Sequence, residues 1–483
     1  MHRTQVFRCL DVRLLRRPGS CLLVLTAFVV LVLCINNTTF WWNGRALAQP
    51  HSCSCYNKHI NDSYDTQTAI LSESVSLGHG MASLSGGFIF HAHAWPALNP
   101  PDSKICLSTF SSVNRLYWLP WLLQAWSGPI SVAVYTPGVD YAVLSKVMQY
   151  LRKCYPLLEL RVAFHVLYPK NQRPLEMTSD FDISEYNCFY HEESVRQIFD
   201  NFRISSDITS VKLPQNHLRN LARRSCDAPF SLVADIDMIP SPLMFERFDL
   251  LLHGNIQCKK CALIVPVYEI DSEEKFLPAN KIALLQMLFE QKAQRYHVKV
   301  YDKNQGNSNL KQWEKANQID KEEVIFWSLF EDFNENSSVF EALRNYKEVP
   351  YREMYKIRGY EEFWEPIVVL PEDAPSFDER FLGFGFCRSS LIYELHQRGF
   401  SFRMLDEPFL SHWGFQTTSH YPRHRIMEIK ENTVRYDAMK RELQARYSIT
   451  SSSQQQQKRA PSKVVQTVRQ APPPLLIIGQ AVG

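Results

Sequence analysis

The chain has 483 residues, of which 45% are hydrophobic and 12% aromatic, so it can bury a large core in one large or two ordinary domains. Its formal net charge is only +3, and no basic tract interleaved with aromatic residues occurs in the body of the chain, which argues against nucleic acid binding. The sequence has no internal repeat.

The N-terminal residues have the pattern of a membrane anchor. An apolar segment at 19–35 follows five arginines: Arg3, Arg8, Arg13, Arg16 and Arg17. Seventeen residues is short for a spanning helix and favours the thin membranes of the early secretory pathway. The arginines predict that residues 1–18 are cytoplasmic and that the rest is luminal. The alternative is a cleaved signal peptide, with Ala46-Leu-Ala48 as its cleavage site; we prefer the anchor because the basic region is long.

The residues after the anchor fit an oxidising lumen. Sequons begin at Asn36, Asn37, Asn61 and Asn336; the first two are close to the bilayer, so glycosylation is expected at Asn61 and Asn336. Nine of the 12 cysteines follow the anchor, and several are expected to pair. Because nine is odd, at least one is free or pairs with another chain. Cys258-Lys-Lys-Cys261 could be half of a zinc site, which we disfavour because no second C-x-x-C run completes it.

Composition divides the remaining chain into three parts. Residues 36–103 are rich in Ser, Asn, His, Gly and Pro without sustained periodicity, and we expect a luminal stem whose distal part could be ordered. Residues 449–483 contain a Gln-rich run and a Pro-rich run and are expected to be disordered. The folded domain is therefore expected at 104–448.

Strands and helices alternate in the folded domain. The predicted strands are 130–135, 160–168, 230–234, 262–268 and 402–405, and the predicted helices are 141–151, 215–224 and 391–399. This alternation predicts an α/β fold with a parallel or mixed sheet covered on both faces. Ligands of such sheets bind at the carboxyl ends of the strands.

Two acids end the predicted strand at 230–234. In Asp235-Ile-Asp237 the two carboxylates are expected on one side, because alternate residues of an extended chain point the same way. Such a pair suits Mg²⁺ or Mn²⁺, and the ion can hold a diphosphate. The chain has no glycine-rich phosphate loop, so a diphosphate needs the metal. The alternative is a solvated turn, which is our interpretation of the same spacing at Asp180-Phe-Asp182, where no apolar run precedes the acids.

Further candidates lie downstream. Asp378 and Glu379 precede the loop Gly383-Phe-Gly385, whose glycines allow close approach of the backbone to a ligand and whose phenylalanines could face a sugar ring. The alternative for this acid pair is a helix N-terminus or a partner for Arg380. His412 is a candidate third metal ligand, since imidazole suits Mn²⁺ better than Mg²⁺; the alternative is an ordinary loop histidine.

Taken together these motifs resemble the LARGE-type glycosyltransferases of family 49. The resemblance spans most of 104–448, in order, and is strongest to members that form β1,4-linked glucuronic acid. The matching segments are Leu116-Tyr117, Trp126–Tyr135, Leu213–Arg223, Asp235–Ser241, Pro278–Lys281, Trp364–Pro366, Phe377–Phe381 and His412–Phe415. It implies a GT-A fold, a Rossmann-like mixed sheet with helices on both faces, as the catalytic domain.

The resemblance also implies a reaction. The donor would be UDP-glucuronate, the cofactor Mn²⁺ with Mg²⁺ as a substitute, and the acceptor a xylose-terminated glycan on a glycoprotein, as in priming the O-mannosyl glycan of dystroglycan. The family works in the Golgi as type II membrane proteins, which agrees with the predicted anchor; a homo- or hetero-oligomer stays open. Asp235, Asp237 and His412 would hold the ion. Inversion at the sugar requires a base, and Asp378 and Glu379 are the candidates.

Other positions are candidates for binding the donor, and two features differ from those of relatives. Arg219, Arg223 and Lys281 are candidates for binding the uronate carboxylate. Relatives carry Asn where this chain has Cys387, so a side-chain amide is missing there. The segment 295–350 is longer than in relatives and could reshape the acceptor side.

Three alternative functions stay open at this point. A luminal lectin or scaffold on the same fold would keep the sugar site without turnover. An aspartate-nucleophile phosphatase also uses D-x-D after a strand, but Ile239 and the late position of the motif fit it poorly. A related transferase could use a different UDP-sugar.

Overall fold

The computed structural model describes residues 83–84, 87–175, 181–202, 212–254, 260–315, 349–417 and 423–459. The predicted anchor at 19–35, the sequons at Asn61 and Asn336 and most of the stem lie outside these residues. Among the described helices none is long and apolar enough to cross a membrane.

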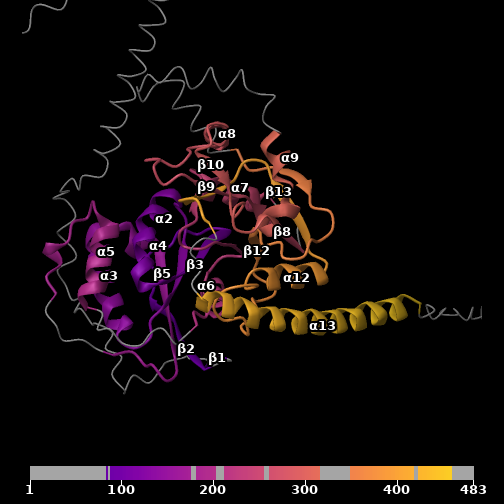
Figure 1. Cartoon of the computed structure of the whole chain (residues 1–483), viewed down its shortest axis with the longest axis horizontal. Coiled ribbons are helices and arrows are strands. Elements are labelled where there is room, and N and C mark those ends of the chain that lie inside the picture. Colours follow the sequence, from indigo (N-terminus) through magenta and orange to yellow (C-terminus); the bar gives the residue numbers. More distant parts are fainter. Residues whose placement is uncertain are drawn as a thin grey trace, which may run out of the picture. The chain divides into compact units, whose positions relative to one another are not determined.

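Ten of the described strands form one mixed sheet in the order β1-β2-β5-β4-β3-β6-β12-β8-β13-β11 (Figure 1). The strands are β1 Ser83–Leu84, β2 Phe88–Trp95, β3 Ile105–Ser112, β4 Ile130–Tyr135, β5 Val162–Pro169, β6 Phe230–Val233, β8 Cys261–Val265, β11 Glu353–Lys356, β12 Ile367–Pro371 and β13 Ser401–Leu405. β3 to β6 are mutually parallel, and β12 runs antiparallel to both β6 and β8. Because β13 is parallel to β8, six strands end at the same edge.

The segments that leave this edge build a second, four-stranded sheet in the order β10-β9-β14-β7. Its strands are β7 Ile239–Pro240, β9 Val267–Ile270, β10 Ala293–Arg295 and β14 Leu410–Trp413. β7 follows β6, β9 follows β8, and β14 follows β13, so three of the four strands continue from an end of the large sheet, while β10 follows α8. This small sheet therefore stands where ligands of α/β proteins bind.

Helices cover the large sheet, and 3₁₀ turns connect several elements (Figure 1). The α-helices are α2 Leu119–Ala125, α3 Asp140–Cys154, α4 Leu157–Arg161, α5 His191–Phe202, α6 Gln215–Arg224, α7 Met244–His253, α8 Lys281–Phe289, α9 Leu310–Lys315, α12 Ser389–Gln397 and α13 Arg423–Arg459. The 3₁₀ turns are η2 Val113–Trp118, η3 Ile183–Glu185 and η5 Asp302–Ser308. α6 packs on β3 and β4, α3 on α5, and α12 on α13.

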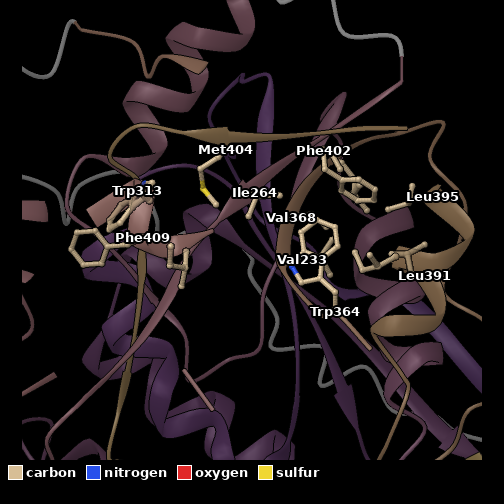
Figure 2. Close-up of a cluster of buried hydrophobic side chains, with 14 of the residues drawn as sticks. Val233, Ile264, Trp313, Trp364, Val368, Leu391, Leu395, Phe402, Met404 and Phe409 are labelled. Carbon is tan, nitrogen blue, oxygen red and sulfur yellow. The ribbon is translucent and has the colours of Figure 1, made fainter. Parts of the chain in front are cut away.

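A large apolar cluster supports β6, the strand that precedes the two acids (Figure 2). Val233 of β6, Ile264 of β8 and Val368 of β12 contribute one side chain each from neighbouring strands. Figure 2 shows Leu391 and Leu395 of α12 beside them. Removing such side chains from water stabilises the fold by about 1.5–3 kcal/mol each, so the end of β6 is firmly positioned.

The elements predicted from sequence agree with the structure in type, with local differences. β4 and α6 have the predicted bounds. The predicted strand at 262–268 is split into β8 and β9 at Pro266, which lacks the amide hydrogen that a ladder needs. The chain also forms β2 within the predicted stem, and α13 continues to Arg459, into the segment expected to be disordered.

Disulfides join parts of the described chain. Cys106 is bonded to Cys226 and Cys154 to Cys188, while Cys387 is a free, buried thiol. These pairs confirm the expectation that several cysteines pair and that at least one does not. Cys261 is also disulfide-bonded, which excludes the zinc interpretation of its C-x-x-C run.

Candidate active site

The two acids of the D-x-D motif lie just beyond the end of β6. Asp235 follows Ala234 in irregular chain, and a backbone hydrogen bond of 3.0 Å from Met238 N to Asp235 O closes a turn that contains Asp237. Ile236 and Met238 are buried, whereas both acids are partly exposed. The carboxylates therefore share the accessible side as expected, although a turn rather than an extended strand presents them.

Two buried guanidiniums hold Asp235. Arg219 Nη2 and Arg388 Nη2 donate to the same oxygen, Oδ1, at 3.0 and 2.8 Å. Burial alone would raise the pKa of Asp235, but the charges of Arg388 and Arg219 outweigh it and hold this pKa well below its usual range. Asp235 is therefore ionised at physiological pH.

Asp237 contacts an imidazole and a third guanidinium. His412 Nε2 lies 3.4 Å from Asp237 Oδ2, and Arg115 donates to the same oxygen. Burial would raise the pKa of Asp237, but the hydrogen bond from His412 and the charge of Arg115 lower it overall. Burial would likewise lower the pKa of His412, and contact with Asp237 raises it instead. Two of the sequence-predicted metal ligands, Asp237 and His412, are thus in contact, and Asp235 lies two residues before Asp237.

Arg115, the two acids and His412 come from segments at one edge of the large sheet. Arg115 is in η2, which follows β3; the acids follow β6; and His412 is in β14, which follows β13. The topology therefore places residues from widely separated parts of the chain at the edge where the sequence predicted a ligand.

A buried acid fixes the surroundings of His412. Glu269 of β9 is opposite His412 in the parallel β9–β14 ladder and is fully buried. Its carboxylate accepts hydrogen bonds from the backbone N of His297 at 2.9 Å and of Gln416 at 3.1 Å. Gln416 in turn reaches both imidazoles, with Nε2 3.2 Å from His412 Nε2 and Oε1 2.8 Å from His297 Nε2. These contacts restrict the ring of His412 to one region of the site.

The donor set suits a divalent cation in its chemistry. Two carboxylates and an imidazole are ligands that Mn²⁺ accepts. In the described part of the chain, however, no three such side chains are gathered closely enough to hold an ion, and arginines neutralise both acids. Arg115 is 47% exposed and can move into solvent, whereas Arg219 and Arg388 are buried and both donate to Asp235 Oδ1. A bound cation would therefore replace Arg115.

The two candidate bases have different partners. Asp378 accepts three hydrogen bonds from the side chain of Arg380, at 2.7 to 3.1 Å, which is the ion-pair alternative considered from the sequence. Glu379 accepts one from Asn220 at 2.9 Å and lies 3.7 Å from the buried His217. A permanent cation, Arg380, thus engages Asp378, whereas the contacts described for Glu379 are with Asn220 and His217.

Helix α6 connects the two halves of the site. Arg219 reaches Asp235, and the next residue, Asn220, reaches Glu379. Asn216 donates to the carbonyl of Asp378 at 2.8 Å. Every residue of α6 except the last is buried, although most are polar. The helix therefore functions as a buried scaffold for the acids rather than as an amphipathic surface helix.

Helix α13 clamps the Gly-Phe-Gly loop. Gly383 and Gly385 have φ of +72° and +95°, and a Cβ at Gly383 would overlap the carboxylate of Glu428. Asn432 donates to the carbonyls of Leu382 and Phe384 at 2.9 Å. The rings contact α13 as well: Arg425 lies 3.7 Å from the ring centroid of Phe384, and Phe386 stacks on Tyr436. The glycines therefore allow approach of a helix, and neither ring is presented as an open sugar platform.

The three candidate uronate ligands lie in different places. Arg219 contacts Asp235, as described above. Lys281 Nζ donates to the carbonyl of Asp406 at 2.7 Å and lies 3.9 Å from the ring centroid of Trp313; burial lowers the pKa of Lys281 to about 8. Arg223 is buried and donates to the carbonyls of Pro371, Glu372, Ala374 and Pro375. The described contacts thus bring only Arg219 of the three to the acids.

Sequence reasoning missed four residues of the site: Arg115, Glu269, Arg388 and Gln416. Arg388 lies between an apolar loop and the apolar face of α12, a context in which its side chain should be buried. A buried guanidinium needs a carboxylate partner, so this context was a signal. Glu269 stands in the apolar run of β8 and β9, where a charge likewise signals a buried network. Arg115 lies in the short 3₁₀ turn η2 and Gln416 in an irregular segment, and neither carries such a signal.

Comparison with known families agrees with this geometry. The family 49 glycosyltransferase model, described as "Glycosyl-transferase for dystroglycan", matches residues 104–334 and 330–448. The chain is 30% identical over 380 residues to beta-1,4-glucuronyltransferase 1 of Bos taurus, covering 76% of this chain and 81% of that protein. The Homo sapiens protein of the same name is 29% identical over the same shares.

A second group of relatives is more distant. Xylosyl- and glucuronyltransferase LARGE2s of Gallus gallus is 25% identical over 324 residues, which cover 65% of this chain and 32% of that protein. The family match covers almost all of the domain built on the large sheet, including the acids and His412. The chain belongs to the family 49 glycosyltransferases.

Proposed function

We propose that this chain transfers glucuronic acid from UDP-glucuronate, in β1,4 linkage, to a xylose-terminated glycan of the O-mannosyl type carried by dystroglycan. The relatives named beta-1,4-glucuronyltransferase 1, matched over 81% of their length, support this donor and linkage. The observation that carries the proposal is the 3.4 Å contact between Asp237 and His412 beside Asp235, since it joins the two motifs required to hold a nucleotide-sugar.

Asp235, Asp237 and His412 would hold Mn²⁺, with Mg²⁺ as a substitute. When bound, the ion would neutralise the charge that develops on the UDP leaving group. The protein prepares this site by keeping Asp235 ionised through Arg219 and Arg388. The partly exposed Arg115, which contacts Asp237, would supply a further positive charge for the anionic diphosphate.

Glu379 is the proposed general base. A β-linkage made from an α-linked UDP-sugar requires a single inverting displacement, so a carboxylate must accept the proton of the acceptor hydroxyl. Both oxygens of Asp378 accept hydrogen bonds from Arg380, whereas a side-chain amide, that of Asn220, positions Glu379. We therefore assign the base to Glu379 and a positioning role to Asp378.

The proposed location is the Golgi membrane, with the domain in the lumen and the anchor at 19–35. The disulfides Cys106–Cys226 and Cys154–Cys188 support an oxidising compartment, because such bonds do not persist in the cytosol.

The test is a donor screen with a β-xyloside acceptor and Mn²⁺, in which UDP-glucuronate, UDP-xylose and UDP-N-acetylglucosamine are compared by mass spectrometry of the product. Transfer of glucuronate, with a β1,4 linkage shown by NMR, is the expected result. Transfer of xylose alone would show that the donor is UDP-xylose, which the word xylosyl in the name of the LARGE2s relative suggests. Glycan binding without turnover of any donor would identify a lectin instead.

A further inference from the structure

Gln416 places its side-chain amide beside the candidate metal ligands. The amide nitrogen is 3.2 Å from His412 Nε2, and the amide oxygen is 2.8 Å from His297 Nε2. Asp237 Oδ2 lies 3.4 Å from the same nitrogen of His412. One imidazole nitrogen therefore faces both a carboxylate oxygen and a side-chain amide.

A backbone carbonyl determines which nitrogen of His412 can bind an ion. Nδ1 lies 3.3 Å from the carbonyl oxygen of Gly414, and because a carbonyl only accepts, Nδ1 carries the proton. Metal-ligating imidazoles commonly donate their other N–H in this way. The lone pair that suits an ion is thus on Nε2, and an ion bound there is on the side of Asp237 and Gln416.

Gln416 is held in place by a buried charge. Its backbone N donates to Glu269 Oε2 at 3.1 Å, and Glu269 is fully buried. The other oxygen of Glu269 accepts from the backbone N of His297, whose φ of +62° is one that few non-glycine residues adopt. A buried carboxylate and a strained backbone both cost stability, and strained residues concentrate at functional sites. The position of Gln416 is therefore well defined, and these features point to a function for it.

The amide of Gln416 can present either of its ends to His412. The oxygen and nitrogen ends have nearly the same shape and exchange places by rotation about the Cγ–Cδ bond. His297 accommodates both orientations, because an imidazole nitrogen donates in one tautomer and accepts in the other. With the amide oxygen toward His412, it joins a carboxylate oxygen and an imidazole nitrogen, and all three are ligands that Mn²⁺ accepts.

The charges of the site show what a further oxygen would add. Arg219 and Arg388 both donate to Asp235 Oδ1, so part of the charge of this acid is already balanced by the protein. An octahedral ion such as Mn²⁺ has room for a ligand beyond three side chains and a diphosphate. A neutral oxygen can fill that position without adding a further negative charge beside the diphosphate.

We propose that the side-chain oxygen of Gln416 is a further ligand of the divalent cation, next to Asp237 and His412, and that Glu269 and His297 position it. The inference rests on the proposed function, which requires the ion. It also has a specific consequence. A carboxylate at position 416 should bind the ion as well, whereas a carboxylate cannot replace an amide that acts only by donating a hydrogen bond to His412.

The test is titration of Mn²⁺ with UDP present, followed by electron paramagnetic resonance, which does not depend on turnover. Gln416→Ala should weaken Mn²⁺ binding by roughly 10- to 100-fold, as is typical when a partner of a metal site is removed. Gln416→Glu should bind Mn²⁺ at least as tightly as the wild type, because it keeps an oxygen ligand and adds charge.

The matched controls are Gln286→Ala and Gln286→Glu, which make the same changes of size and charge on α8. Gln286 is exposed, and its described side-chain hydrogen bond goes to Glu290 at 2.9 Å, so neither change should alter Mn²⁺ binding. Thermal denaturation in EDTA should give the same midpoint for all five proteins, which separates the loss of a ligand from the loss of the fold.

Three results would overturn the inference: unchanged Mn²⁺ binding in Gln416→Ala, weakened binding in Gln416→Glu, or no binding by the wild type. Failure of the proposed function is seen separately, in the turnover of UDP-glucuronate. If Gln416→Ala loses Mn²⁺ and the wild type does not turn this donor over, the inference holds and the function fails. If the donor is turned over and Gln416→Ala binds Mn²⁺ like the wild type, the function holds and the inference fails.

Discussion

Arg219 and Asp235 are joined by a hydrogen bond of 3.0 Å, and this contact links the buried helix α6 to the acid that follows β6. Arg219 is 4% exposed, and Arg388 is the second cation on the same carboxylate oxygen. The ion pair therefore combines a structural role with the electrostatic preparation of the site.

Arg219→Met should lower the free energy of unfolding by roughly 3 kcal/mol, because removing one partner leaves buried charge incompletely paired. Chemical denaturation measured by fluorescence would give this value. Arg224→Met is the control on the same helix: Arg224 is exposed and donates only to Ser376 among its described hydrogen bonds, so its loss should cost less than about 1 kcal/mol. Equal effects of the two variants would contradict the role of Arg219.

His165 should make stability depend on pH. Burial, with a contribution from His93, lowers the pKa of His165 to about 3, while the unfolded chain has its ordinary value of 6.5. Between these values the unfolded state binds the proton that the folded state excludes, so stability falls as pH decreases from 6.5. Between pH 7 and pH 4.5 the free energy of unfolding of His165→Gln should fall by roughly 2 to 3 kcal/mol less than that of the wild type.

Denaturation at the two pH values would measure this difference. His165 Nε2 lies 2.9 Å from Ser131 Oγ, so a glutamine can retain a hydrogen bond, and the comparison isolates the titration. The same pH dependence in both proteins would show that His165 does not cause it.

Gly383→Ala should destabilise the loop after the candidate bases. Alanine at this position would have to adopt a φ of +72°, which L residues rarely adopt, and its methyl group would overlap Glu428. We expect the free energy of unfolding to fall by roughly 2 to 4 kcal/mol. The control Gly359→Ala should lose about 1 kcal/mol, because φ there is +78° but no atom lies within 4 Å of the added Cβ. Partial recovery in Gly383→Ala/Glu428→Ala would confirm the clash, and no recovery would refute it. Thermal denaturation of the variants is sufficient.

Glu379→Gln should lower kcat by roughly 10²- to 10⁴-fold, because it removes the proposed base while Gln can still accept from Asn220. Asp378→Asn should act mainly through its ion pair with Arg380, with a smaller loss of kcat and reduced stability. Initial rates at saturating donor and acceptor measure both. A larger loss of kcat in Asp378→Asn than in Glu379→Gln would reverse the assignment.

The sequence predicted much of the central sheet but not all of it. β4 and β6 were predicted because their apolar runs are closed by turn residues or acids. β3 escaped because Ile105–Ser112 contains three serines and a threonine, whose burial depends on neighbouring strands rather than on the segment itself. α6 was predicted as a helix from its spacing of apolar residues, but the burial of its polar side chains depends on tertiary contacts.

Part of the candidate site could be predicted from local sequence patterns, and the rest depends on long-range contacts. Asp235, Asp237 and His412 lie at strand ends, so local pattern and family resemblance together indicated them. Arg388 and Glu269 act through contacts with segments about 150 residues away, and no local pattern encodes such a pairing. Arg223 was predicted as a donor ligand from its charge, and only the fold shows that backbone carbonyls surround its guanidinium.

The central claim is that Asp235, Asp237 and His412 form a divalent-cation site that holds a UDP-sugar. Titration of Mn²⁺ with UDP present, followed by electron paramagnetic resonance, tests it most directly. The wild type and Asp182→Ala, a change in the exposed second acid of the other D-x-D run, should bind one equivalent of Mn²⁺, and Asp237→Ala should lose this binding. Equal binding of Mn²⁺ by all three proteins, or none by the wild type, would contradict the account.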